Sequence, residues 1–241
     1  MKRRIKSLIL VTIIGVLLCS CAKSQTIELD MVEIPHTSYK MLRTEVTQKL
    51  YMQVMGYNPS EFHGDDLPVE SVTWIDAIKF CNELSVKNGL NPVYSSPRDT
   101  LNGVSVVADA SANGYRLPTA QEWEYAARGG EKYRYSGSNY QDEVAWYDGN
   151  SGGTSHPVAQ KKPNGYGLYD MTGNVKERCW DIIYYSGKHS DAFNGYYNKT
   201  RGGSWKTEHL DVLGDYPLWW NSTKLEDAFS TVGFRIVQNI K

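Results

Sequence analysis

The sequence predicts an α+β domain that contains little regular secondary structure. Segments with helix caps are confined to the first half of the chain. Beyond residue 130 the chain is rich in glycine, asparagine, aspartate, tyrosine and proline, and no convincing helix can be placed there. No internal repeat or low-complexity linker divides the chain. We therefore expect one folded domain, and a mature chain of about 220 residues is long enough to bury a substantial core.

The amino terminus is typical of a secretory signal peptide. Four basic residues between Lys2 and Lys6 precede an apolar run over residues 8–18. The run is too short to span a bilayer comfortably and fits the hydrophobic part of a signal peptide. We expect residues 1–20 to be removed from the mature protein.

The end of this run resembles the motif at which bacterial lipoproteins are cleaved and acylated. Cys21 follows a small residue, whereas Cys19 follows Leu18, so Cys21 is the better lipid acceptor. We expect cleavage before Cys21 and a lipidated tether over residues 21–28. Several acyl chains would anchor the protein firmly, since a single chain binds a membrane only marginally. The alternative is an ordinary signal peptide with incidental cysteines.

Two helices are predicted before residue 90. Thr47 can cap the first, which Gly56 would end, and its apolar residues are Leu50, Tyr51 and Val54. Thr73 with Asp76 begins the second. Residues at helical spacing along the second helix should face one core, and they are Ala77, Ile78, Cys81 and Leu84.

A third helix opens at a capping box formed by Thr119 and Glu122. Gly129 and Gly130 should end it. Its packed side is predicted to carry Trp123, Ala126 and Ala127. The charged residues around this helix are expected to tie loops together as scaffold and not to act in catalysis, and they are Arg116, Glu122, Glu124 and Arg128.

Charge and cysteine content restrict the functional classes. Without residues 1–20 the chain has 22 basic and 27 acidic residues, a net charge of −5. This balance argues against nonspecific nucleic-acid binding, which needs a basic face. Only Cys81 and Cys179 remain besides the lipid acceptor. We expect both to be buried small apolar residues, the alternative being one disulfide. We also expect a monomer.

Seven segments occur in the order in which they are found in one protein family. They are residues 45–48 (EVTQ), 67–74 (LPVESVTW), 114–128 (GYRLPTAQEWEYAAR), 156–158 (HPV), 162–177 (KPNGYGLYDMTGNVKE), 201–205 (RGGSW) and 233–237 (GFRIV). Together they resemble the formylglycine-generating-enzyme (sulfatase-modifying factor) family over residues 29–241. The resemblance implies a C-type-lectin-like fold.

The resemblance does not extend to the oxidase chemistry of the family. Catalytic members carry a cysteine pair after the arginine-glycine-glycine-serine motif, and this pair binds copper(I). The corresponding positions here hold Thr207 and Val212, and neither side chain can replace a thiolate. The related branch that uses iron on three histidines also has a helical domain that this chain lacks. His156 is expected to be structural and His209 to be a surface contact. We therefore expect no enzyme activity and no required cofactor.

A structural calcium ion is the remaining metal hypothesis. Asn174 and Glu177 match the asparagine and glutamate of a family segment that often holds calcium together with backbone carbonyls. Oxygen ligands suit this ion, which takes about 6–8 of them. The alternative is that Glu177 pairs with an arginine.

The segment between the last two family motifs, residues 206–231, is called the window below. It has no persistent helical or strand period, and it mixes aromatic rings with short polar groups, as binding surfaces do. The expected ligand-binding residues are Thr207, His209, Asp211, Asp215, Tyr216, Trp219, Trp220, Asn221, Asp227, Phe229 and Ser230. For the adjacent Trp219 and Trp220, core packing of one ring is the alternative.

Some members of this family are targets of diversity-generating retroelements, which rewrite adenines in codons between the same two motifs. The polar residue types of the window are those reachable from asparagine codons, and the chain ends soon after residue 237. We therefore expect a surface-exposed lipoprotein of the cell envelope, anchored at the outer membrane, whose window binds variable macromolecular ligands, most often proteins. The alternative is a nondiversified envelope lipoprotein or an inactive relative of the sulfatase-modifying factors.

Overall fold

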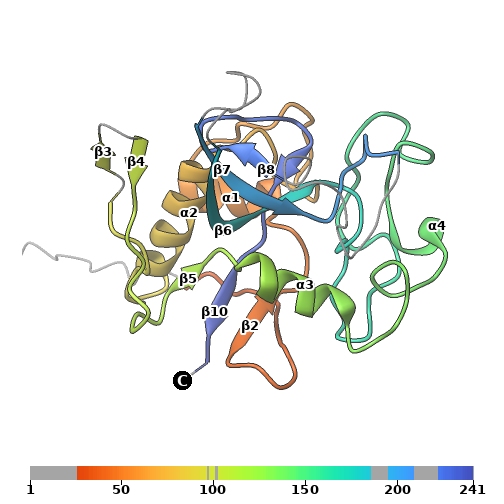
Figure 1. Cartoon of the computed structure of the whole chain (residues 1–241), viewed down its shortest axis with the longest axis horizontal. Helices are drawn as coiled ribbons and strands as arrows, with labels where there is room; N and C mark the ends of the chain where they lie inside the picture. The colour runs from red at the N-terminus through yellow and green to blue at the C-terminus, as the bar shows by residue number, and fades with distance from the viewer. Residues whose placement is uncertain (1–25, 97, 101–102, 186–194, 209–221, 241) are drawn as a thin grey trace, which may run out of the picture.

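The structure is a computed structural model that describes residues 26–240 except 97, 101–102, 186–194 and 209–221. The three predicted helices are confirmed (Figure 1): α1 is Gln48–Met55, α2 is Trp74–Lys87 and α3 is Ala120–Arg128. Thr47, Thr73 and Thr119 cap them through their side chains. Gly56 and Gly129 end α1 and α3 in the left-handed conformation, which glycine adopts without steric penalty.

One expectation about helices needs correction. The chain beyond residue 130 was expected to lack a helix, yet Gln141–Val144 forms the single turn α4. Tyr140 precedes it without a side-chain cap, and Val144 is buried. A four-residue turn is too short to show a helical period in sequence, and here packing of Val144 fixes it.

In the part of the chain that the structure describes, two four-stranded sheets and one hairpin accompany the helices. The first sheet has the order β1-β2-β10-β5 and joins Met31–Glu33, Tyr39–Leu42, Val237–Asn239 and Tyr115–Arg116. The second has the order β8-β7-β6-β9 and joins Ser222–Lys224, Gly195–Arg201, Lys176–Tyr185 and Val232–Gly233. Strands β3, Arg98–Thr100, and β4, Gly103–Ser105, form the hairpin at the left of Figure 1. Strand β10 lies between β2 and β5 and pairs with both of them.

Two apolar clusters form the core. One surrounds α1 and α2 and contains Trp74 and Phe80, and the other surrounds α3 and contains Trp123. The helix residues predicted to face the core are buried, including Cys81. Cys81 and Cys179 are both free and buried, so the expectation of two small apolar residues is confirmed and the disulfide alternative is excluded.

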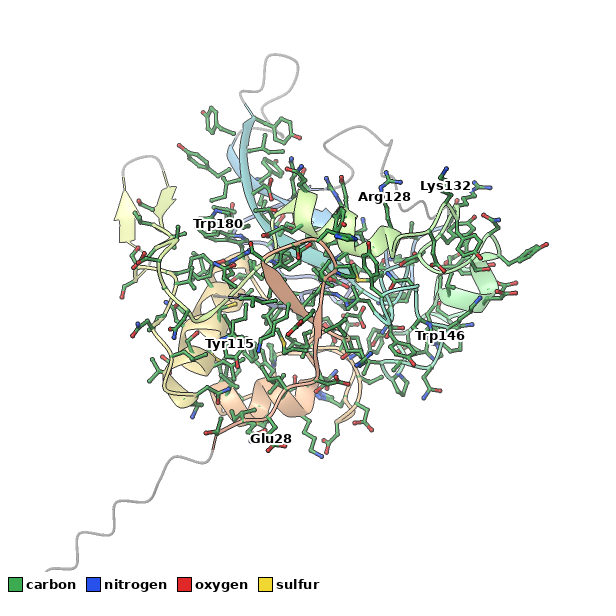
Figure 2. The ribbon with its side chains drawn as sticks, turned by 90° about the horizontal axis from the view of Figure 1, so that it is seen from below. Glu28, Tyr115, Arg128, Lys132, Trp146 and Trp180 are labelled. Carbon is green, nitrogen blue, oxygen red and sulfur yellow. The ribbon has the colours of Figure 1, made fainter. Side chains whose placement is uncertain are left out.

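The scaffold role expected of the charges around α3 is borne out at three of four positions. Arg116 makes two hydrogen bonds of 2.7 Å to the carboxylate of Glu122. Arg201 reaches Glu124 at 2.7 Å and joins the end of β7 to the helix. The side chain of Arg128 is exposed instead, and Figure 2 shows it pointing away from the body. Within the described residues, no helix combines the length and apolar character that crossing a bilayer requires.

Candidate functional site

Both ends of the window are bound to one part of the scaffold. At its start, the backbone nitrogen of Trp205 donates to the Asn174 oxygen at 2.7 Å. At its end, the backbone nitrogen of Lys176 donates to the backbone oxygen of Thr231 at 2.8 Å. Strand β9 follows and pairs with β6 in parallel. The indole nitrogen of Trp205 donates to the backbone oxygen of Ser230 at 3.0 Å, which joins the two ends directly. Both ends of the window are therefore held by scaffold backbone, and within its described part β8 pairs with β7.

A buried ion pair lies beneath this closure. Arg235 binds the carboxylate of Glu177 through two nitrogens, each at 2.6 Å, and both side chains are fully buried. Trp123 donates its indole N–H to the same carboxylate at 2.6 Å. Burial lowers the pKa of Arg235, but Glu177 outweighs it and the net shift is upward, so the guanidinium stays charged. The pair connects β6 with the chain that follows the window.

Two further carboxylates are buried near this pair. Glu45 accepts hydrogen bonds from the backbone of Val175 at 3.1 Å and from the Asn174 amide at 2.8 Å. Burial, with the charges of Asp170 and Glu177, raises the pKa of Glu45 well above its usual value. Burial likewise raises the pKa of Asp170 to about 6. Glu45, Asp170 and Glu177 thus all lie near the guanidinium of Arg235, which pairs directly with Glu177 alone.

The side chains expected to hold calcium do not fit a shared ion in this arrangement. Both oxygens of Glu177 accept hydrogen bonds from Arg235, and one also accepts from Trp123. The amide oxygen of Asn174 accepts from the backbone of His156 at 3.0 Å. Glu177 therefore pairs with an arginine, which was the alternative to calcium. Among the described residues, no group of three or more histidine, cysteine or acidic side chains is placed to hold a metal.

His156 has the structural role expected of it. Its ring stacks on Trp146 with centroids 3.8 Å apart, and its Nε2 lies 2.7 Å from the Ser151 oxygen. Ser151 in turn donates its hydroxyl proton to the Trp205 oxygen at 2.8 Å. This loop supports the start of the window from the side.

Arg178 supports the other end of the window, and sequence reasoning missed it. The guanidinium is buried and binds the Thr223 hydroxyl at 2.9 Å, the Asn198 amide oxygen, and the backbone oxygen of Asp227. Burial lowers its pKa to about 10, so it remains charged at neutral pH. No local pattern could have identified this contact, because Arg178 is 49 residues from Asp227 in the sequence.

A pocket of about 310 Å³ opens between the scaffold and the end of the window. Glu61, Ser71 and Trp205 form its fixed wall. Its other wall belongs to the window and is formed by Lys206, Ala228, Phe229, Ser230 and Thr231. Ser71 and Trp205 belong to the family segments 67–74 and 201–205, whereas Glu61 had no sequence signal, since it is an exposed acid in a loop. A ligand in this pocket would contact constant and window residues together.

Of the predicted ligand-binding residues, four belong to the described part of the chain. Phe229 is 47% exposed and Ser230 is half-buried, and both line the pocket. Thr207 is half-buried, and its hydroxyl accepts from the Ser204 nitrogen at 3.0 Å, so it holds a turn. Asp227 is half-buried beside Arg178. Outside the described residues lie His209, Asp211, Asp215, Tyr216, Trp219, Trp220 and Asn221, together with Val212 and the lipid acceptor Cys21.

The described thiols are unsuited to binding copper(I). Burial raises the pKa of both Cys81 and Cys179, so each is a protonated thiol at neutral pH. Thr207 occupies the first of the two positions where catalytic relatives carry cysteine, and it is engaged with Ser204.

Known proteins resemble this chain in sequence and in fold. A model of the sulfatase-modifying factor enzyme 1-like domain matches residues 21–240. The chaperone protein LppX of Paenibacillus barcinonensis is 36% identical over 90% of this chain and 93% of that protein. The mouse formylglycine-generating enzyme is 30% identical over 75% of this chain and 46% of the enzyme.

Among solved structures, Treponema denticola variable protein 1 superimposes with a TM-score of 0.70 at 32% identity, over 88% of this chain and 92% of that one. This likeness agrees with a resemblance of the sequence to Treponema variable protein A. Because a family model covers nearly the whole chain and the helices and sheets match those of family members, this protein belongs to the sulfatase-modifying factor enzyme 1-like domain family and has its C-type-lectin-like fold.

Proposed function

We propose that this protein is a lipid-anchored, surface-displayed binding protein of the cell envelope, whose window over residues 206–231 binds macromolecular ligands, mainly proteins. The observation that carries the proposal is the closure of the window by Trp205 and Ser230 on a buried scaffold. Side chains of the window that do not join the scaffold can be exchanged without refolding the domain, whereas Leu225 is part of the buried core and β8 pairs with β7. Phe229 and the composite pocket provide an exposed aromatic group and a concave surface at one end of the window.

The placement of the N-terminal segment supports display of the window away from the membrane. Ile27 is held by Asn88 through a hydrogen bond of 2.8 Å, so the described chain begins beside the end of α2. Figure 2 places Glu28 beside α1 at the lower edge, whereas the strands β6 and β7 extend from the upper side. A lipid on Cys21 would be joined to the domain by a short tether on the side of Glu28.

Two relatives support a role in binding over a role in oxidation. One is named a chaperone protein and the other a variable protein, and the alignments to both cover about nine tenths of this chain. Thr207 in place of the first copper-binding cysteine adds a chemical reason, because a hydroxyl does not replace a thiolate on copper(I). Adenine-directed diversification of the window is part of the proposal, since residues 201–205 and 233–237 flank it as they do in diversified relatives.

Exchange of the window tests the binding role directly. We would replace residues 206–231 with the window of a diversified relative and probe an array of surface proteins with both chains. The proposal expects a changed binding profile on a domain whose free energy of unfolding is retained. A folded chimera with an unchanged profile would remove the window from the binding surface.

The lipid anchor has its own test. Metabolic labelling with a radioactive fatty acid should label the protein, and Cys21→Ser should abolish the label while Cys19→Ser retains it. Label that persists in Cys21→Ser would contradict the assignment of Cys21.

The absence of oxidase activity is also measurable. Purified protein supplied with copper(I), oxygen and a cysteine-containing sulfatase peptide should form no formylglycine above a control that contains the metal alone. Turnover above that control would restore the enzymatic role of the family.

A nondiversified envelope lipoprotein is the second candidate, and the 36% identity to a chaperone protein favours it. The gene neighbourhood separates the two candidates. A template repeat that differs from the window codons only at adenines is expected for a diversified protein, and its absence would favour the second candidate.

A further inference from the structure

The two edges of β6 are paired very differently. Along one edge, β7 pairs with β6 from Glu177 to Tyr185. Along the other edge, β9 pairs only at Lys176 and Glu177. Beyond this pairing, the Trp180 nitrogen donates a hydrogen bond of 2.8 Å to the Pro118 oxygen, and the Asp181 carboxylate accepts one of 2.6 Å from the Ala120 nitrogen. No strand of the described chain pairs with this edge over residues 181–185, and such an edge offers its N–H and C=O groups to another extended segment.

A second pocket lies where Pro118 leaves this edge. It has a volume of about 270 Å³ and shares no residue with the pocket at the window. Its apolar lining comes from two loops and from β6, and consists of Val93, Tyr94, Ala108, Ala110, Leu117 and Trp180. In Figure 2, Trp180 lies on the side of β6 that faces the β3–β4 hairpin. The pocket therefore adjoins the point at which the edge of β6 becomes open.

The aromatic lining of this pocket is held rigidly. Trp180 stacks on Tyr94 with ring centroids 4.7 Å apart and on Trp74 with centroids 5.2 Å apart. The Tyr94 hydroxyl accepts a hydrogen bond from the Leu117 nitrogen at 2.9 Å. A lining whose rings are already fixed loses little conformational entropy when a ligand binds.

Two of the three charged residues that line the pocket neutralise each other. Arg116 and Glu122 pair through two hydrogen bonds of 2.7 Å. The arginine also binds the Asn239 amide oxygen at 2.7 Å. Asp109 also lines the pocket and keeps a negative charge, its carboxylate accepting hydrogen bonds from Ser111, so the lining disfavours an anionic group and its remaining surface favours an apolar one.

Apolar side chains continue along the open part of β6. Ile182 is 40% exposed and Tyr184 is 58% exposed, and they share one face of the strand. The Tyr184 ring lies 4.9 Å from that of Tyr196 on β7. A segment paired with this edge would cover part of this apolar surface.

We propose that the open edge of β6 and the adjoining pocket form a second binding site, which takes an extended peptide segment of another protein as an added strand. One apolar side chain of that segment fills the pocket beside Trp180. The pocket volume lies just below the range of about 300–1,000 Å³ typical of small-molecule sites and suits a side chain better. Main-chain hydrogen bonds provide affinity in this mode, and the pocket provides selectivity for the apolar residue.

The test uses a random heptapeptide library displayed on phage and the mature full-length protein. Enriched peptides should share an apolar residue with extended flanking residues. The best peptide, made synthetically, should slow amide hydrogen exchange at residues 181–185. Two methylated peptides are then compared, one with N-methyl groups on the odd backbone amides and one on the even ones. The peptide whose methyl groups block the amides facing β6 should bind at least tenfold more weakly, and the other less than twofold more weakly.

Two protein variants locate the site. Ala110→Trp fills the pocket from an exposed position and should weaken binding of the same peptide at least tenfold. Val107→Trp is the matched control, because Val107 is 66% exposed on the same segment and does not line the pocket. Its binding should stay within twofold of the original protein.

Several outcomes would overturn the proposal. They are a library without enriched peptides, binding that is unaffected by Ala110→Trp, and protection of residues 181–185 by dimerisation of the protein alone, seen in sedimentation. The window chimera described above should bind the same peptide with unchanged affinity. Loss of peptide binding in the chimera would show that the peptide binds the window and not β6. The proposed site on β6 and the proposed role of the window can therefore be contradicted independently of each other.

Discussion

The indole nitrogen of Trp205 and the backbone oxygen of Ser230 are 3.0 Å apart, although 24 residues separate these two in the sequence. This hydrogen bond closes the window on itself. Trp205 also packs edge-to-face on Phe62, with ring centroids 5.5 Å apart. The aromatic packing and the hydrogen bond can be separated by a substitution that keeps a ring at this position.

Trp205→Phe should lower the free energy of unfolding by about 0.5–1.5 kcal/mol, the usual contribution of one hydrogen bond. The backbone oxygen of Ser230 would lose its partner, whereas the ring would still pack on Phe62. Denaturant melts measure the loss, and hydrogen exchange over residues 222–231 should speed up. Exchange that stays unchanged there would show that other contacts close the window.

The scaffold and the window should respond differently to truncation. Trp123→Ala removes a fully buried ring and should cost about 3–5 kcal/mol. Ser230→Ala should change stability by no more than about 0.5 kcal/mol, because only its backbone takes part in the closure. Both values come from denaturant melts, and similar losses at the two positions would make the window structural.

The buried pair of Glu177 and Arg235 should show strong coupling. Arg235→Met leaves a carboxylate buried without its partner and should cost about 3–5 kcal/mol. Glu177→Gln removes the charge but keeps an oxygen for Trp123. In a double-mutant cycle the double variant should lose much less than the sum of the single losses. Additive losses would mean that the two groups do not interact across the scaffold.

Asp170 should make stability depend on pH. Its pKa is raised from 3.8 to about 6, so the folded state binds this proton more tightly than the unfolded chain does. The stability that it contributes is present at low pH and is lost as the pH rises through about 6. Asp170→Asn should therefore be more stable than the original protein at pH 8, by on the order of 2–3 kcal/mol.

The advantage of Asp170→Asn should disappear below about pH 3, where the carboxyl is protonated in both states. Thermal melts across this range measure the difference. Asp65→Asn, an exposed carboxylate in a loop, is the matched control and should behave like the original protein throughout. A constant advantage at every pH would point to packing instead of proton binding.

Calcium should have no effect on stability. The oxygens of Glu177 and the amide oxygen of Asn174 are already occupied by protein donors. An ion that bound only the folded state would raise Tm in proportion to its occupancy. Tm is expected to be the same in millimolar calcium and in excess chelator, and a rise with calcium would mean that these side chains rearrange around an ion.

Local signals in the sequence predicted the helices but not the arrangement below the window. A threonine cap and a terminal glycine act within one or two turns, so Thr47 and Gly56 identified α1 from neighbouring residues alone. The strands of two or three residues are too short to show an alternating pattern. Glu45 and Val175 are 130 residues apart, and only the folded chain brings them together. The family resemblance predicted the position of the window, but the contribution of Glu61 and Arg178 emerged only from the structure.

The parallel pairing of β9 with β6 has a consequence for how the window can change in length. Lengthening a loop between fixed anchors costs little, since each doubling adds only about 0.6 kcal/mol of closure entropy. Insertions in this segment should therefore be tolerated much as substitutions are. If the window binds ligands as proposed, such a scaffold would allow the reach of the contact surface to change as well as its chemistry, provided that Leu225 keeps its place in the core.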